Sequence, residues 1–197
     1  MDTMHAPGGA EVRVPEAGAW VLDTAHTRVG FAARYMMLGK VRGHFATVDG
    51  TVRVGDSPET SEVEVTMDAS SIDTNMEMRD DHLRSPDFLD VETYPTLTFR
   101  STAVEKTGPA TGLITGDLTI KAVTRPVVLE AEYLGMAPGP DGSERAAFSA
   151  RGRIDREEWG IIWNVALETG GWLVGPTVDL EIEVMLTRGE DVPRAGA

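Results

Sequence analysis

TVDLEIEVMLTR, residues 177–188, alternates apolar and polar side chains along most of its length. Such alternation is typical of a β-strand, because successive side chains of an extended chain point to opposite faces. The apolar face carries Val178, Leu180, Ile182, Val184 and Leu186, and the other face carries Asp179, Glu181 and Glu183. At about 3.3 Å per residue the segment spans about 40 Å, which predicts a strand of a tall barrel with a dry inside and a wet outside.

The same period of two recurs through the chain and predicts an all-β fold. Further strands are expected at 20–23, 27–36, 41–54, 61–72, 96–104, 112–120, 126–135 and 146–155. Short turn sequences separate them, including Asp49-Gly50 and Gly139-Pro140-Asp141-Gly142. About eight or nine antiparallel strands result, and closure into a barrel or folding into a sandwich would hide their edges. We expect one domain over residues 19–188, with flexible tails at 1–18 and 189–197.

One segment lacks the alternation and predicts helix instead. Helix formers run from Met76 to Arg84, and Ser85-Pro86 resembles an N-cap followed by proline at the first helical position. We therefore expect one or two short helices near residues 76–91, which would lie across the barrel or cap one end.

Charge and composition limit the classes of molecule that the chain is expected to bind. The chain carries 32 acidic and 18 basic residues, a formal net charge of −14, and no cysteine. Negative charge disfavours nucleic acid and anionic membrane surfaces, and no apolar run reaches the roughly 20 residues of a membrane span. We expect neither nucleic-acid binding nor stable membrane insertion. No signal-peptide-like run opens the sequence, so a cytoplasmic location is expected.

Several motifs in order resemble the YceI-like family. They are WVLDTAHTRVGFAARY at 20–35, RDDHLRSPDFLDVETYPTLTFRST at 79–102, GDLTIKAVTRPVVL at 116–129, and the region from Arg156–Gly160 to Val174. The resemblance covers residues 19–188 and implies a lipocalin-like barrel that binds polyisoprenoids or related lipids. The chain departs from the family pattern at Thr27, Tyr35 and Ala122, where serine, histidine and glycine are usual. Tyr35 replaces an imidazole with a phenol, which would change what the cavity mouth holds.

The function expected is binding, with storage or transport, of a long apolar ligand inside the barrel. A polyprenyl quinone, a polyprenyl phosphate or a fatty-acyl lipid would fit, and no further cofactor is required. Small inward residues beside large ones make room in a barrel of this size, although an ordinary packed core has the same pattern. The candidate ligand-binding residues are Phe31, Ala33, Tyr35, Phe45, Met67, Met76, Leu83, Phe88, Phe99, Leu118, Phe148, Trp163 and Trp172. Trp163 and Trp172 could form the cavity rim or a core layer below it.

The polar cluster at 79–84 has two interpretations. Arg79, His82 and Arg84 are candidate head-group contacts, and Arg79 with Asp80 is expected to form an ion pair that fixes the helix. The alternative is an enzyme with His82 and Asp80 as acid–base groups, but neighbouring helical positions point apart and no second histidine completes a zinc pair. We predict no catalytic activity and no metal site. A self-associating module, for example a homodimer, is the other alternative.

Overall fold

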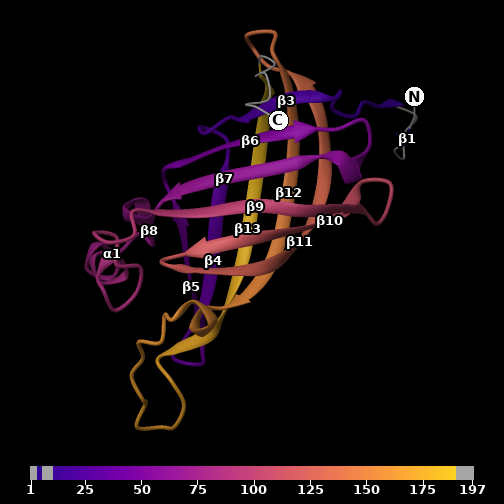
Figure 1. The fold of residues 1–197 in the computed structure, drawn as a ribbon. Coiled ribbons are helices and arrows are strands. Elements are labelled where there is room, and N and C mark those ends of the chain that lie inside the picture. The colour runs from indigo at the N-terminus through magenta and orange to yellow at the C-terminus, as the bar shows by residue number, and fades with distance from the viewer. Residues whose placement is uncertain (1–3, 6–10, 190–197) are drawn as a thin grey trace.

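The computed structural model describes residues 4–5 and 11–189, and it contains a closed antiparallel barrel of eight strands (Figure 1). The barrel strands are β3 Gly18–Leu22, β6 Val48–Val54, β7 Glu62–Asp68, β9 Thr96–Lys106, β10 Thr111–Ile120, β11 Val123–Pro138, β12 Glu144–Asp155 and β13 Val174–Arg188. Closure occurs at β13, which pairs with β12 on one side and with β3 on the other. The all-β barrel expected from the alternation, lipocalin-like as the YceI-like resemblance implied, is confirmed.

Three further strands extend the wall beyond the barrel proper. They are β4 Arg28–Tyr35, β5 Gly39–Phe45 and β8 Ile72–Asp73. The first part of β13 pairs with β4, whereas its last three residues pair with β3. Shorter elements complete the chain: the paired strands β1 Met4–His5 and β2 Glu11–Val12, and the 3-10 helices η1 Pro58–Thr60, η2 Ala69–Ser71 and η3 Arg156–Trp159.

The single strand expected at 41–54 is wrong, because the structure divides it into β5 and β6. The break occurs where Ala46 donates its N–H to the Ser71 carbonyl at 3.0 Å and Thr47 donates to the Ser71 hydroxyl at 3.0 Å. These bonds turn the chain, so β5 pairs with β4 and β8 while β6 pairs with β3 and β7. Alternation of side chains continues through such a bend and cannot reveal it.

One α-helix, α1 Glu77–Arg84, lies at one end of the barrel (Figure 1). Of the one or two helices expected here, α1 forms, and residues after Ser85-Pro86 form turns rather than a second helix. Ser85 instead ends α1, since its N–H and its hydroxyl both donate to the His82 carbonyl, at 3.1 and 2.7 Å. Turns follow, with the N–H groups of Phe88 and Asp90 both bonded to the Ser85 carbonyl.

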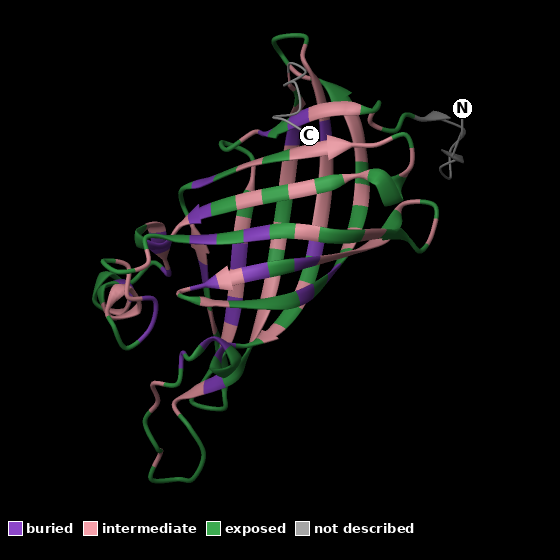
Figure 2. Cartoon of the chain, viewed as in Figure 1, coloured by how far each residue is buried: buried purple, intermediate pink, exposed green. Residues whose placement is uncertain are grey.

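The chain before β3 contacts the barrel in its described part. Arg13 forms an ion pair with Glu144 of β12 at 2.6 Å, and the Trp20 indole donates to the Glu16 carbonyl at 3.0 Å. Trp20 is fully buried, and the burial map shows buried positions at this end of the barrel as well as near α1 (Figure 2). Residues 1–3 and 6–10 of the predicted tail 1–18, and residues 190–197 of the predicted tail 189–197, lie outside the described residues.

Arg156 holds the long segment 161–174 against the barrel end. This arginine is buried, and its guanidinium donates to the carbonyls of Ile161, Trp163, Val174 and Gly175. Burial lowers the pKa of Arg156, but the ordinary value is so high that the group stays charged. Its closest carboxylate, Glu157, is 4.0 Å away, so the carbonyls satisfy most of its donors. Both ends of the segment are therefore joined at one cation.

Replacing Arg156 with leucine should therefore loosen this segment and destabilise the fold. Each buried carbonyl left without a donor costs about 1–3 kcal/mol, so a loss of about 3 kcal/mol or more is expected in urea unfolding. Cleavage within 161–174 by a nonspecific protease should also accelerate. Arg151→Leu, at an exposed position of β12, is the control. An Arg156→Leu protein with the stability of this control would contradict the assignment.

Asp179 joins three strands through charge. Its carboxylate accepts from Lys40 of β5 at 2.6 Å and from Arg153 of β12 at 3.0 Å. Hydrogen bonds from Lys40 and Arg153 lower the pKa of Asp179 and outweigh the opposing effect of burial. A lowered pKa in the folded state stabilises the fold above the ordinary carboxyl pKa, and this stabilisation is lost as the pH falls through the lowered value.

Asp179→Asn should consequently lower the free energy of unfolding at neutral pH by about 0.5–1 kcal/mol, the range of partly exposed ion pairs. The difference from the wild type should shrink as the pH falls through the lowered pKa of Asp179, because the wild-type carboxylate is then protonated too. Chemical denaturation at several pH values measures both effects. Asp117→Asn, on the exposed face of β10, should show neither; a pH-independent difference for Asp179→Asn would contradict the ion-pair explanation.

Candidate functional site

The inner wall of the barrel is lined by apolar side chains of unequal size. Cross-strand pairing places Gly112 of β10 beside Ala131 of β11, and Ala131 beside Ala150 of β12. The next residue in this row is Ile182 of β13. Three small residues in succession form a recess, because no side chain projects far from that part of the wall.

Packing differs along the barrel interior. Toward the α1 end the inward residues Met67, Leu118, Val127 and Leu129 are buried. Farther along the same strands, the inward residues Val63, Val65, Ile114, Ala131, Tyr133 and Met136 are only partly buried, although they pack against the core. Protein cores are close-packed, so partly exposed apolar residues on an inner face indicate accessible room. That room lies in the part of the barrel away from α1.

A second accessible stretch lies on the inner face of β4, β5 and β13. Phe31 and Phe45 lie 6.0 Å apart between ring centroids, and both are partly buried. Gly43 is opposite Phe31, and a Cβ added there would come within 2.5 Å of the Phe31 ring. A glycine is therefore required at this position if Phe31 is to lie along the wall.

Thr74 fixes α1 to the chain that precedes it. Buried Asp80 accepts from the Thr74 N–H at 2.9 Å and from the Thr74 hydroxyl. Arg79 donates to the same hydroxyl at 2.7 Å and to the Thr74 carbonyl at 2.8 Å. The ion pair expected between Arg79 and Asp80 is therefore wrong: both side chains bind Thr74. Arg84 donates to the carbonyls of Ser70 and Ile72, so both arginines serve to hold the helix.

Three rings join α1 to the segment held by Arg156. The His82 ring lies edge-on to Phe88 at 5.0 Å and to Trp163 at 4.6 Å, and Phe88 lies 5.3 Å from Trp163. The other contact of His82 is Asp87, 2.9 Å from its Nε2. Asp80 bonds elsewhere, so the structure does not assemble the acid–base pair that the enzyme alternative requires.

The predicted binding residues fall into three groups. Phe31, Ala33, Phe45 and Phe148 lie partly buried on the inner wall, with Leu83 and Trp163 partly buried at the α1 end; Met67, Phe88, Phe99 and Leu118 are buried. Tyr35, Met76 and Trp172 are 39%, 49% and 55% exposed, and lie on loops or at strand ends. The prediction missed Ala131 and Tyr133 on β11, which the inward positions of the strand expected at 126–135 would have indicated. It also missed the clamp formed by Arg156, for which the sequence carries no local signal.

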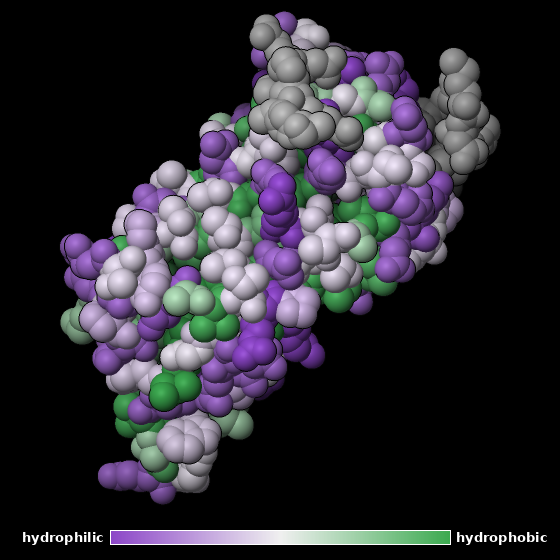
Figure 3. All heavy atoms as spheres, viewed as in Figure 1, coloured by the Kyte–Doolittle hydropathy of each residue, from purple (hydrophilic) through white to green (hydrophobic). Residues whose placement is uncertain are grey.

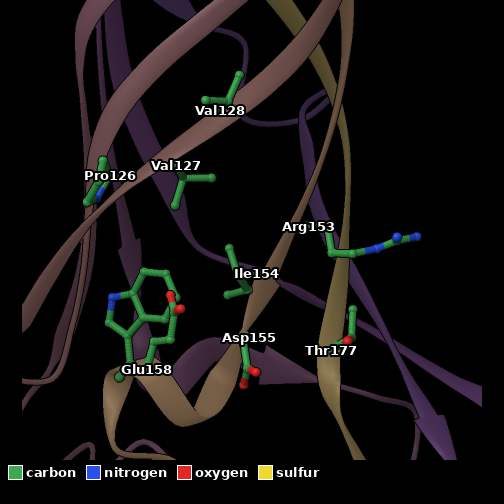
Figure 4. A pocket seen from close by; sticks show the side chains of 9 residues that line it. Pro126, Val127, Val128, Arg153, Ile154, Asp155, Glu158 and Thr177 are labelled. Carbon is green, nitrogen blue, oxygen red and sulfur yellow. The ribbon is translucent and has the colours of Figure 1, made fainter.

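Two hollows on the barrel do not correspond to the predicted site. One, of about 410 Å³, lies where the β11–β12 ladder ends at Leu129 and Gly152 (Figure 4). Its lining combines Val127, Ile154 and Trp159 with the charged Asp155 and Glu158. The other, of about 330 Å³, is lined by Gly112 and Ala131 together with the charged Glu130, Glu132 and Arg151. Charged borders suit neither hollow to a long apolar ligand.

The described part of the chain offers two further observations. Within residues 4–5 and 11–189, no group of three or more histidines and acids is placed to hold a metal ion. The helices in these ranges are too short or too polar to cross a bilayer.

Comparison with known proteins identifies the family. The YceI-like domain matches residues 20–186. Protein YceI of Escherichia coli O157:H7 is 42% identical over 137 residues, covering 69% of this chain and 71% of that protein.

Solved structures show the same architecture. A YCEI protein of Campylobacter jejuni superposes with a TM-score of 0.69 at 34% identity, over 86% of this chain and 97% of that one. A polyisoprenoid binding domain from Saccharophagus degradans superposes with a TM-score of 0.65 at 14% identity, over 87% and 99% of the two chains, and this shows likeness of fold alone. The barrel, its helix and the sequence match together establish that the chain belongs to the YceI-like family.

Proposed function

We propose that the barrel binds a long apolar ligand along its inner wall and stores or carries it. The partly buried apolar inner wall of a closed barrel is the observation that carries this proposal. An inner wall with accessible apolar surface gains free energy when a hydrocarbon chain covers it. Similarity to a polyisoprenoid binding domain supports an isoprenoid or other lipid as the ligand.

The ligand needs little length to bind well. Burial contributes about 0.8 kcal/mol per CH₂, or roughly 4 kcal/mol for each five-carbon isoprene unit before the costs of binding. A few units therefore account for a useful affinity, and the depth of the interior would select the chain length. Polyprenyl quinones, polyprenyl phosphates and fatty-acyl lipids all meet this requirement.

His82 is the strongest of the three head-group candidates. Arg79 and Arg84 already donate to backbone carbonyls, which commits part of each guanidinium to holding the helix. His82 binds only a side-chain carboxylate, that of Asp87, and lies beside Trp163 at the end of the barrel. A polar head group could take the place of the Asp87 contact without unfolding α1.

Purified protein should release a prenyl or acyl lipid into organic solvent, detectable by mass spectrometry. Ala131→Trp would fill the recess of small residues from within, and the amount of extracted lipid should fall several-fold because each displaced CH₂ loses its burial. Ala131 is only partly buried, so the larger side chain has room to enter.

Ala137→Trp is the matched control, since Ala137 lies on the same strand at an exposed position. It should retain the lipid content of the wild type. Wild-type protein that yields no lipid and binds no added prenyl or acyl probe would refute the proposal. Equal lipid in both variants would place the ligand elsewhere.

A further inference from the structure

Exposed apolar side chains gather at one end of the molecule. We define the apolar tip as residues 35–38, which are Tyr, Met, Met and Leu, together with Ile162, Val165 and Trp172. Their exposure reaches 86% at Leu38 and 70% at Ile162. The β4–β5 turn and the 161–173 segment both project at the lower end of the barrel (Figure 1), and apolar atoms recur over this end (Figure 3).

The two parts of the apolar tip adjoin each other. Met36 donates its N–H to the Leu173 carbonyl at 2.7 Å. The Met37 side chain lies 3.5 Å from the position that a Cβ on Gly171 would occupy. The segment also bonds within itself, as Leu173 donates to the Val165 carbonyl at 2.9 Å. The tip is therefore one surface with its backbone groups paired, and not two unrelated loops.

The β4–β5 turn breaks a local sequence rule. Met36 and Met37 have φ values of 52° and 59°, in the left-handed region, and Leu38 donates to the Tyr35 carbonyl at 3.1 Å within the three-residue loop that joins Tyr35 to Gly39. Asparagine and glycine suit these two positions, whereas methionine adopts positive φ at a steric cost. Both methionines are about half exposed, so packing within the fold does not compensate the cost. Backbone strain that is kept at an exposed apolar turn indicates that the turn serves a contact with another molecule and not the stability of the fold.

The apolar tip is also nearly neutral in a chain with net charge −14. Residues 29–48 contain no acid, and residues 159–178 contain one, Glu168. Of the basic groups beside the turn, Lys40 pairs with Asp179 at 2.6 Å and Arg42 pairs with Glu181 at 3.5 Å. The apolar tip itself can therefore meet a phosphate-bearing surface without the local repulsion that the acidic faces of the molecule would meet.

We propose that the apolar tip docks the protein on the surface of a lipid bilayer, an inference that rests on the proposed function because docking would bring the barrel to a source of apolar ligand. Trp and Tyr prefer the boundary between head groups and acyl chains, and methionine and leucine can enter it. The same segment contributes Trp163 to the ring cluster at the barrel end, so docking places that end at the membrane.

A bilayer fits this surface better than a second copy of the chain does. Stable dimers bury about 800 Å² on each partner over matched surfaces. Two projecting loops meet another copy only at their ends, whereas a convex apolar projection enters a fluid lipid interface without a complementary partner.

Flotation with phosphatidylcholine vesicles tests the proposal. The wild type should float with the vesicles, and the double variant Met36→Asn, Met37→Gly should lose at least about tenfold in partitioning because two apolar side chains no longer leave water. Asparagine and glycine adopt positive φ more readily than methionine, so the unfolding temperature of this variant should stay equal or rise. Leu134→Ser, at a 57% exposed position on β11 away from the tip, is the matched control and should float as the wild type does.

The outcomes separate docking from ligand binding. Retention of the extracted lipid by the double variant, with loss of flotation, supports the proposal. A wild type that holds lipid but does not float, or a double variant that floats equally well, would overturn docking and leave the carrier function intact. Light scattering that shows a dimer dispersed by the double variant, without flotation of the wild type, would assign the apolar tip to a second copy and also overturn it.

Discussion

The hydrogen-bond ladder of β13 is the constraint on which the rest of the structure depends. This strand pairs with β12 over eleven registered residue pairs, from Arg145–Thr187 to Asp155–Thr177. On its other edge it changes partners, from β4 in its first part to β3 in its last three residues. Closure removes the exposed sheet edges, and the change of partner lets the β4–β5 hairpin project beyond the barrel. The pairing of β13 therefore determines both the closed inner wall of the barrel and the projecting β4–β5 turn.

The two ends of the binding wall are stabilised differently. Near α1, Thr74 forms hydrogen bonds with both Arg79 and Asp80. At the same end, Arg156 donates to the backbone carbonyls at the two ends of the 161–174 segment. His82, Phe88 and Trp163 then bring these two units into contact. Buried polar groups must be satisfied, so both units are specified tightly where they meet. Away from α1, Asp23 and Arg145 form a partly buried ion pair at 2.6 Å, while the inward apolar residues of this part of the barrel keep accessible surface.

The proposed binding and docking surfaces share this organisation. The apolar inner wall lies within the barrel, and the apolar tip lies outside it, on the segment that Arg156 secures. A lipid carrier faces the difficulty that its ligand is nearly insoluble in water. Contact between the barrel end and a membrane would shorten the aqueous path of that ligand, which gives the exposed methionines of the turn a physical purpose.

The sequence by itself determined most of the strand pattern, the all-β fold and the presence of α1, because a side-chain period of two or of 3.6 residues can be read from neighbouring positions. It also indicated the apolar character of the inner wall. It did not reveal the break between β5 and β6, because the alternation of side chains along a strand is the same whichever strand pairs with it. Only the tertiary structure decided that Tyr35 and Trp172 lie outside, that Arg79 and Asp80 meet through Thr74, and that Arg156 joins distant carbonyls. Those contacts depend on which distant segments the closed barrel brings together. A local sequence pattern does not specify which distant segments become neighbours.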